Sequence, residues 1–215
     1  MANPALTQLI PAEELAPGAI SAIRNDVINA LVALAARELG LPSEKLVVRD
    51  VRPFSDLQLY STGAVDSTSD RWGYAATGTT IGFVAINGTK TMGDQRYVAL
   101  FGVRDRGAAG NVASGSATLA VVKTANKPAV SLIKINVGGA DKVIWDLTGM
   151  YAYTSKMAAF APSAVIIPQN STFVISYYRQ GSLEVGTTTG PVTDEISWLQ
   201  LVGVVVEPRG KVVSP

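Results

Sequence analysis

Most of the chain is a succession of short apolar runs separated by residues that form turns. Between residues 47 and 206, stretches of Val, Ile, Thr, Tyr and Phe alternate with Gly, Asn, Pro and Ser, which is typical of a β-sandwich or β-barrel. Leu132, Lys134 and Asn136 alternate with apolar neighbours, as in a strand with one buried face. The pattern predicts strands over 46–51, 56–60, 80–86, 96–103, 117–123, 130–137, 142–147, 164–167, 172–179 and 196–207.

One segment near the N-terminus has the period of a helix instead. Between residues 20 and 39, apolar side chains recur at spacings of three and four, which predicts a helix with one apolar face. Gly40 and Pro42 follow, a combination that ends helices. We expect the helix to pack through Ile23, Val27, Leu31 and Leu34, either on the β domain or on a neighbouring subunit.

The predicted elements indicate an all-β domain, an antiparallel sandwich preceded by one helix and an extended arm. The connections at 61–79 and 148–163 are long, which favours jelly-roll wiring, with an immunoglobulin-like sandwich as the alternative. Asn87-Gly88 is a tight-turn signal expected to join the neighbouring strands. Prolines make 1–17 an irregular arm, followed by the helix in 18–41, the β domain in 42–207 and a tail in 208–215.

The composition is unusually low in charge. Charged residues make up 16% of the chain, against about 25% in typical domains. A surface with so few charges is most simply explained if copies of the chain or other partners cover part of it; a monomer with a Ser-, Thr- and Asn-rich surface is the alternative. The net charge of +1 favours neither nucleic acid nor an anionic membrane. The sequence shows no signal-peptide pattern and no long uninterrupted apolar run, so we expect no transmembrane segment.

The chain contains no His and no Cys, which removes the commonest catalytic base, the best nucleophile and most zinc sites. The remaining candidates for chemistry are the carboxylates Asp66, Asp70, Asp194 and Glu195, all in predicted loops, where acidic residues normally serve turns. The pair Asp66 and Asp70 is too sparse to indicate a calcium site. We therefore expect no enzyme activity, no catalytic residue, no metal site and no cofactor.

Two other groups of residues are candidates for binding. Arg104 and Arg106, with Arg96 nearby, form a small basic cluster that suits ion pairs between subunits or on an edge strand better than a nucleic-acid surface. Two aromatic pairs have the chemistry of a sugar-binding surface, although aromatic residues are also common at protein interfaces: Trp72 with Tyr74, and Tyr151 with Tyr153.

The arm, the helix and the low-charge β region that ends in a long apolar strand (EISWLQLVGVVVE, 195–207) together resemble single jelly-roll virion proteins of icosahedral viruses and phages. The segment AVIIPQNSTFVISYY (164–178) resembles the entry from loop to strand in many jelly rolls. The resemblance implies a capsid protein that assembles with copies of itself and with other virion proteins. A carbohydrate-binding or receptor-binding β-sandwich, located outside the cell or on its surface, is the alternative.

Overall fold

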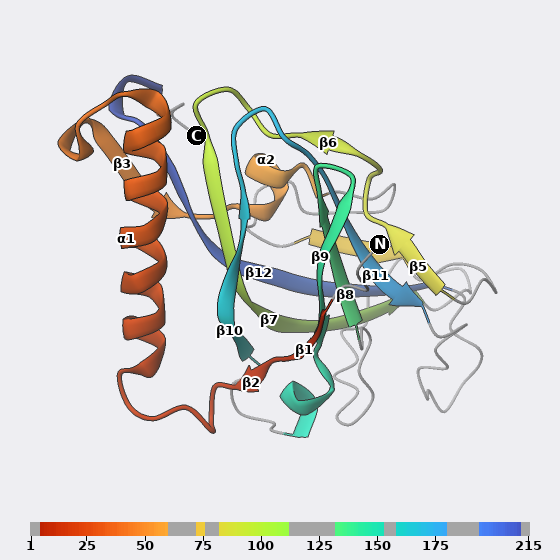
Figure 1. Ribbon diagram of the computed structural model, residues 1–215. Coiled ribbons are helices and arrows are strands. Elements are labelled where there is room, and N and C mark those ends of the chain that lie inside the picture. Colours follow the sequence, from red (N-terminus) through yellow and green to blue (C-terminus); the bar gives the residue numbers. More distant parts are fainter. Residues whose placement is uncertain are drawn as a thin grey trace.

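The computed structural model describes residues 5–59, 72–75, 82–111, 132–152, 158–179 and 194–211. These residues form a β-sandwich of two sheets, called A and B, and one long helix lies on the outer face of sheet B (Figure 1). The predicted all-β sandwich with an N-terminal helix is confirmed at this level.

Sheet A contains six strands, which pair in the order β1-β9-β8-β11-β5, while β6 also pairs with β11. The pair β1–β9 is parallel, and the others are antiparallel. The strands of sheet A are β1 (Ala5–Gln8), β5 (Gly82–Ala85), β6 (Lys90–Thr91), β8 (Leu132–Val137), β9 (Ala140–Asp146) and β11 (Thr172–Arg179).

Sheet B also contains six strands, which pair in the order β2-β10-β7-β12-β3, while β4 pairs with β12. All of its pairs are antiparallel. The strands of sheet B are β2 (Ile10–Pro11), β3 (Leu46–Asp50), β4 (Trp72–Ala75), β7 (Tyr97–Asn111), β10 (Ala158–Ile167) and β12 (Asp194–Pro208).

The main core lies between the two sheets. In β8, Ile133, Ile135 and Val137 are buried, whereas Leu132 and Lys134 are half-buried on the outer face. This confirms the alternation predicted from the sequence. The largest side chain of this core, Trp145 in the neighbouring strand β9, is completely buried.

The long helix α1 (Ala19–Leu39) covers the outer face of sheet B (Figure 1). Leu31 and Ala35 are completely buried there, and the more peripheral apolar residues of the helix are half-buried around them. The helix ends as predicted, because Gly40 adopts a left-handed conformation with φ of 62° and its N–H bonds to the carbonyl of Ala36.

The segment expected to be an irregular arm instead adds a short strand to each sheet. Strand β1 pairs with β9 and forms one edge of sheet A, and β2 pairs with β10 and forms one edge of sheet B. Leu9, between them, is buried in the main core. Pro11 permits this arrangement because it lies on an edge strand, where a missing N–H costs little. Over residues 5–12 the segment therefore lies on its own β domain.

Two local predictions are wrong for identifiable reasons. The predicted strand 56–60 is replaced over its first two residues by a short helix, α2 (Pro53–Leu57), because Pro53 suits the first helical turn and the carboxylate of Asp56 accepts the N–H of Arg52 at 2.8 Å. Asn87 and Gly88 do have positive φ, yet the two strands that they were expected to join, β5 and the strand that starts near Arg96 (β7), lie in different sheets and form no hairpin.

The two-residue hairpin turn of sheet A is instead made by Gly138-Gly139, between β8 and β9. Three short 3₁₀ helices complete the described structure: η1 (Ser43–Lys45), η2 (Thr148–Ala152) and η3 (Arg209–Lys211). The predicted strand 117–123 lies outside the described residues.

Candidate functional site

Strand β7, at the centre of sheet B, is irregular at Phe101. Its neighbour Gly102 pairs with Val202 of β12 and with Phe160 of β10, and Leu100 pairs with the next partners along both strands, Gly203 and Val165. Phe101 is therefore skipped by the pairing on both sides. One extra residue in β7 relative to β12 is a β-bulge, a device that redirects the side chains following it.

The bulge changes which side chains of β7 face the interior. Leu100 and Val103 both belong to the main core, although strict alternation would place them on opposite faces. Phe101 belongs to the cluster beneath α1, and Arg104 is exposed. Without the extra residue, Arg104 would follow Leu100 into the interior, where an unpaired charge is costly.

Two glycines keep the backbones close together at this level. A side chain at Gly203 would place its Cβ 2.4 Å from the carbonyl oxygen of Ala99. At Gly102 the Cβ would lie 2.8 Å from the carbonyl oxygen of Ala159 and equally close to the ring of Phe160. Both positions therefore require glycine because of close packing rather than because of an unusual φ.

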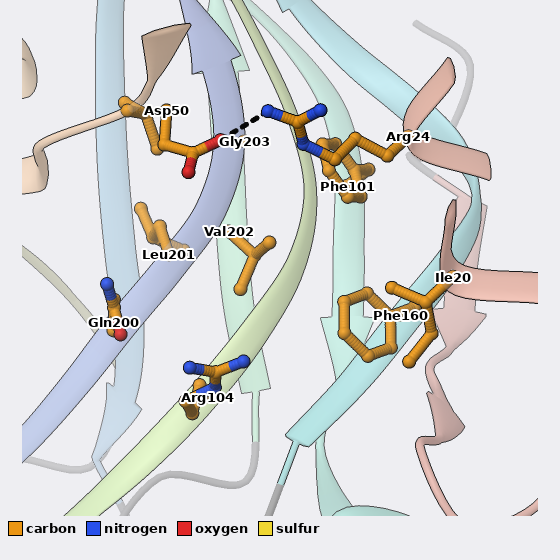
Figure 2. A pocket seen from close by; sticks show the side chains of 11 residues that line it. Ile20, Arg24, Asp50, Phe101, Arg104, Phe160, Gln200, Leu201, Val202 and Gly203 are labelled. Atoms are coloured by element: carbon orange, nitrogen blue, oxygen red, sulfur yellow. Dashed lines mark hydrogen bonds and ion pairs between the residues drawn. The ribbon is translucent and has the colours of Figure 1, made fainter. Parts of the chain in front are cut away.

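A hollow of about 220 Å³ opens on the outer face of sheet B, beside the start of α1 (Figure 2). Its apolar wall is formed mainly by Phe101, Phe160, Ile20 and Val202. The rings of Phe101 and Phe160 stack with centroids 6.4 Å apart and an interplanar angle of 26°. Its remaining lining residues are Arg24, Asp50, Val51, Arg104, Gln200, Leu201 and Gly203.

The polar rim of the hollow carries one cation that is not neutralised by a described residue. Arg24 Nη2 of α1 lies 2.9 Å from Asp50 Oδ1 of β3, so these two charges balance each other. Figure 2 shows this pair at one end of the hollow and Arg104 at the other. Among the residues that the structure describes, Arg104 has no ion-pair partner.

A second polar feature lies at the end of the sandwich interior near α2. Arg49 binds Asp56 through both terminal nitrogens, at 2.6 and 2.7 Å, and binds Glu207 through Nε at 2.9 Å. Arg96 approaches the same two carboxylates, with its Nε 3.0 Å from Glu207 and its Nη1 3.5 Å from Asp56. The side chains of both acids are 3% exposed.

This charge cluster (Arg49, Arg96, Asp56 and Glu207) balances two positive with two negative charges. Its hydrogen bonds, above all those to Asp56, raise the pKa of the Arg49 guanidinium above its ordinary value. Each carboxylate is bound by both arginines, an arrangement suited to closing the core at this end of the sandwich.

The predicted interface residues fall in different places. Ile23, Val27, Leu31 and Leu34 all pack in the cluster between α1 and sheet B. Of the predicted basic cluster, Arg104 lies at the rim of the hollow, whereas the nearby Arg96 belongs to the charge cluster. Arg106 lies in β7, and its side chain is outside the described residues.

The aromatic pairs are described only in part. Trp72 and Tyr74 lie in β4, which pairs with β12, and Tyr151 lies in η2; their side chains, and the whole of Tyr153, are outside the described residues. Asp66 and Asp70 are also outside. Asp194 and Glu195, expected in a loop, begin strand β12, because their backbones pair with the end of β7.

The hollow was not predicted from the sequence, although two glycines in the sequence indicate that the strands are distorted there. Gly102 and Gly203 are isolated glycines inside otherwise apolar strand patterns, and such glycines mark bulges or closely approaching backbones. The partners that complete the hollow, Phe160 from β10 and Ile20 from α1, come from distant parts of the chain.

Comparison with known proteins gives no further identification: no protein family, curated protein or solved structure matches the chain. By length and composition alone, α1 is apolar enough to cross a membrane. In this structure its apolar face packs on sheet B. The expectation that the chain has no transmembrane segment stays a prediction.

Proposed function

We propose that the β domain is a jelly roll and that the protein is a structural subunit of a virion shell. The strand pairing supports the jelly roll. Four strand pairs are nested in chain order: β3 with β12, β5 with β11, β7 with β10 and β8 with β9. The first strand of this set pairs with the last, the second with the next to last, and so on inward, as in one long hairpin that has been folded over. The pairs β12–β7 and β11–β8 then join these hairpin segments into two sheets, which is the wiring of a jelly roll.

The observation that carries the proposed function is the composition of the outer face of sheet A. Leu6 is 65% exposed there, the one large apolar side chain that is mostly exposed among the described residues. A row of cross-strand neighbours leads from Leu6 to Ala85 at the opposite edge, through the half-buried Ile144 and Lys134 and the buried Ser176. The apolar members of this row are Leu6, Ile144 and Ala85.

Aromatic rings extend this apolar surface. Phe83 and Tyr178 meet edge to face, with centroids 5.2 Å apart, and both are half-buried. The Nζ of Lys134 lies 4.8 Å from the centre of the Phe83 ring. Half-exposed aromatic rings beside apolar side chains are the residue types that form the centres of protein interfaces.

The occupant we propose for this face is a second copy of the chain. Lys134 lies on β8, and Asp141, Lys142 and Asp146 lie on its neighbour β9, so these two strands carry equal numbers of both signs. Lys134 lies 3.5 Å from Asp141. A neutral surface with both signs interspersed can meet its own copy without net repulsion, whereas a strongly charged partner would gain little there. Other virion proteins would then complete the shell.

The test is assembly of the purified full chain, measured by sedimentation velocity and electron microscopy. Leu6→Lys and Ala85→Lys place charges on exposed positions at opposite edges of the face, so they should prevent assembly while leaving the melting temperature nearly unchanged. Ala33→Lys, on the exposed side of α1, is the matched control and should assemble normally.

Two results would reject these proposals separately. A wild-type protein that stays monomeric at every concentration would exclude the shell function. Wild-type particles that form equally well from Leu6→Lys and Ala85→Lys would show that copies meet elsewhere and would remove sheet A from the proposal.

A further inference from the structure

The hollow on the outer face of sheet B combines an apolar wall with a cation at its rim. We propose that this hollow binds a small amphipathic carboxylate, an anion whose body is a short alkyl chain or a single ring. The inference does not depend on the shell function, because the hollow and the face proposed for assembly belong to the outer faces of different sheets.

The wall suits the apolar body of such a ligand. Phe101, Phe160, Ile20 and Val202 surround the hollow with side chains from four elements, β7, β10, α1 and β12. Phe101 and Phe160 are already almost completely buried and form the floor of the hollow, whereas Ile20 and Val202 are half-buried. A ligand that fills the hollow would remove the exposed parts of Ile20 and Val202 from water, which provides the driving force for binding. The volume of about 220 Å³ limits the body to a small group.

The rim selects the sign of the ligand's charge. Arg24 is already neutralised by Asp50, so the available charge at the hollow is that of Arg104. A guanidinium presents paired N–H donors in a plane, a geometry that matches the two oxygens of a carboxylate. An apolar amine of the same size would meet the positive charge of Arg104 and should bind poorly.

The backbone shows how the cation comes to lie at this rim. The extra residue of β7 at Phe101 keeps Val103 in the main core and turns Arg104 outward. Gly203 and Gly102 let the neighbouring strands pass at distances that no side chain would allow. In a regular strand the side chains would alternate strictly, and Arg104 would not face outward at the hollow. The position of this cation therefore arises from one local distortion of β7.

Three ligands with the same alkyl chain test the proposal: octanoate, 1-octanol and octylamine. Binding to the full chain is measured by equilibrium dialysis and calorimetry at physiological ionic strength. We expect octanoate to bind saturably at one site per chain, about tenfold more tightly than octanol, since a hydrogen bond to a charged group contributes at least that factor. Octylamine should bind more weakly than octanol.

Variants then assign the site. Arg104→Gln should reduce octanoate binding about tenfold and leave octanol unchanged. Val202→Trp should fill the hollow and abolish binding of both. Arg37→Gln removes an exposed arginine from the last turn of α1, so it is the matched control for net charge and should bind like the wild type.

Several results would overturn the proposal. Octanoate that does not saturate, or that binds no better than octanol, would show that the hollow does not select an anion. Equal losses in Arg104→Gln and Arg37→Gln would show that only the net charge matters. If Val202→Trp melts like the wild type and still binds octanoate, the ligand lies elsewhere. Assembly-defective Leu6→Lys should bind octanoate normally, which separates this proposal from the proposed function.

Discussion

The hydroxyl of Tyr97 donates a hydrogen bond of 2.9 Å to Oε2 of Glu38. Tyr97 begins β7 and is completely buried, whereas Glu38 lies in the last turn of α1 and is exposed. The bond therefore ties the end of the helix to the central strand of sheet B. Burial, followed by the hydrogen bond to Glu38 and the negative charges of Glu38 and Asp94, raises the pKa of Tyr97 above its ordinary value of 10.0.

The raised pKa predicts that the protein loses stability at high pH. In the unfolded chain Tyr97 releases its proton near pH 10.0, while in the folded protein it keeps the proton. Above that pH, Tyr97 alone should therefore lower the free energy of unfolding by about 1.4 kcal/mol per pH unit, until its folded-state pKa is reached. Urea unfolding of the wild type and of Tyr97→Phe, measured from about two pH units below the unfolded pKa to about one unit above it, isolates this contribution.

Tyr97→Phe should lose the hydrogen bond, at a cost of about 1 kcal/mol near neutral pH. The difference between the two proteins should then shrink as the pH rises above 10, because the phenylalanine cannot ionise. If the difference stays constant across this range, Tyr97 ionises equally easily in both states and the inferred environment is wrong.

The charge cluster predicts that breaking a buried ion pair lowers the free energy of unfolding more than breaking an exposed one. Arg49→Met would leave Asp56 and Glu207 with one arginine between them, and breaking such a buried network costs about 3 to 5 kcal/mol. Arg24→Met breaks the pair with Asp50, whose side chains are 41% and 78% exposed, and should cost less than about 1 kcal/mol. Urea denaturation measures both, and similar costs for the two variants would contradict the structural role assigned to the cluster.

The parts of the fold that depend on local periodicity could be predicted from the sequence. The alternation around Ile133 and Ile135 and the helical spacing of Val27 and Leu31 reflect burial of one face, which each segment records in its own residues. The conformation around Asp56 could not be predicted in this way. Pro53 and the bond from the N–H of Arg52 to Asp56 favour the helix locally. The Asp56 carboxylate is also held by Arg49 of β3 and by Arg96, which precedes β7, and these tertiary contacts cannot be read from the local sequence.

The candidate site was less accessible to prediction, for a related reason. Arg104 was singled out from the sequence, but as part of a basic cluster with Arg106, and with Arg96 nearby, that would form ion pairs. Arg96 does not join Arg104, because eight residues of extended chain place the two about 26 Å apart and because the extra residue at Phe101 reverses which face each later side chain takes. That reversal depends on the register of β7 against β12, which is set by pairing between segments about a hundred residues apart.

The N-terminal segment should stabilise the domain rather than only link it to others. Leu9 is buried between the two sheets, and Leu9→Ala should lower the free energy of unfolding by about 2 to 5 kcal/mol. Leu6→Ala is the matched control, because Leu6 is 65% exposed and its truncation should cost about 0.5 kcal/mol or less. Thermal and urea unfolding test the pair. Equal, small effects would restore the view of residues 5–12 as a detachable arm.

Gly203 offers a test of the distorted strand pairing beneath the hollow. Gly203→Ala places a Cβ 2.4 Å from the carbonyl oxygen of Ala99, a backbone atom that cannot move aside without disturbing β7. Overpacking of this kind costs about 1 to 3 kcal/mol or more. Gly93→Ala is the control, since its Cβ would meet nothing within 4 Å and its φ is ordinary, so it should leave stability unchanged or slightly improved. If Gly203→Ala unfolds at the same urea concentration as Gly93→Ala, then β7 and β12 are not held at the close approach on which the hollow depends.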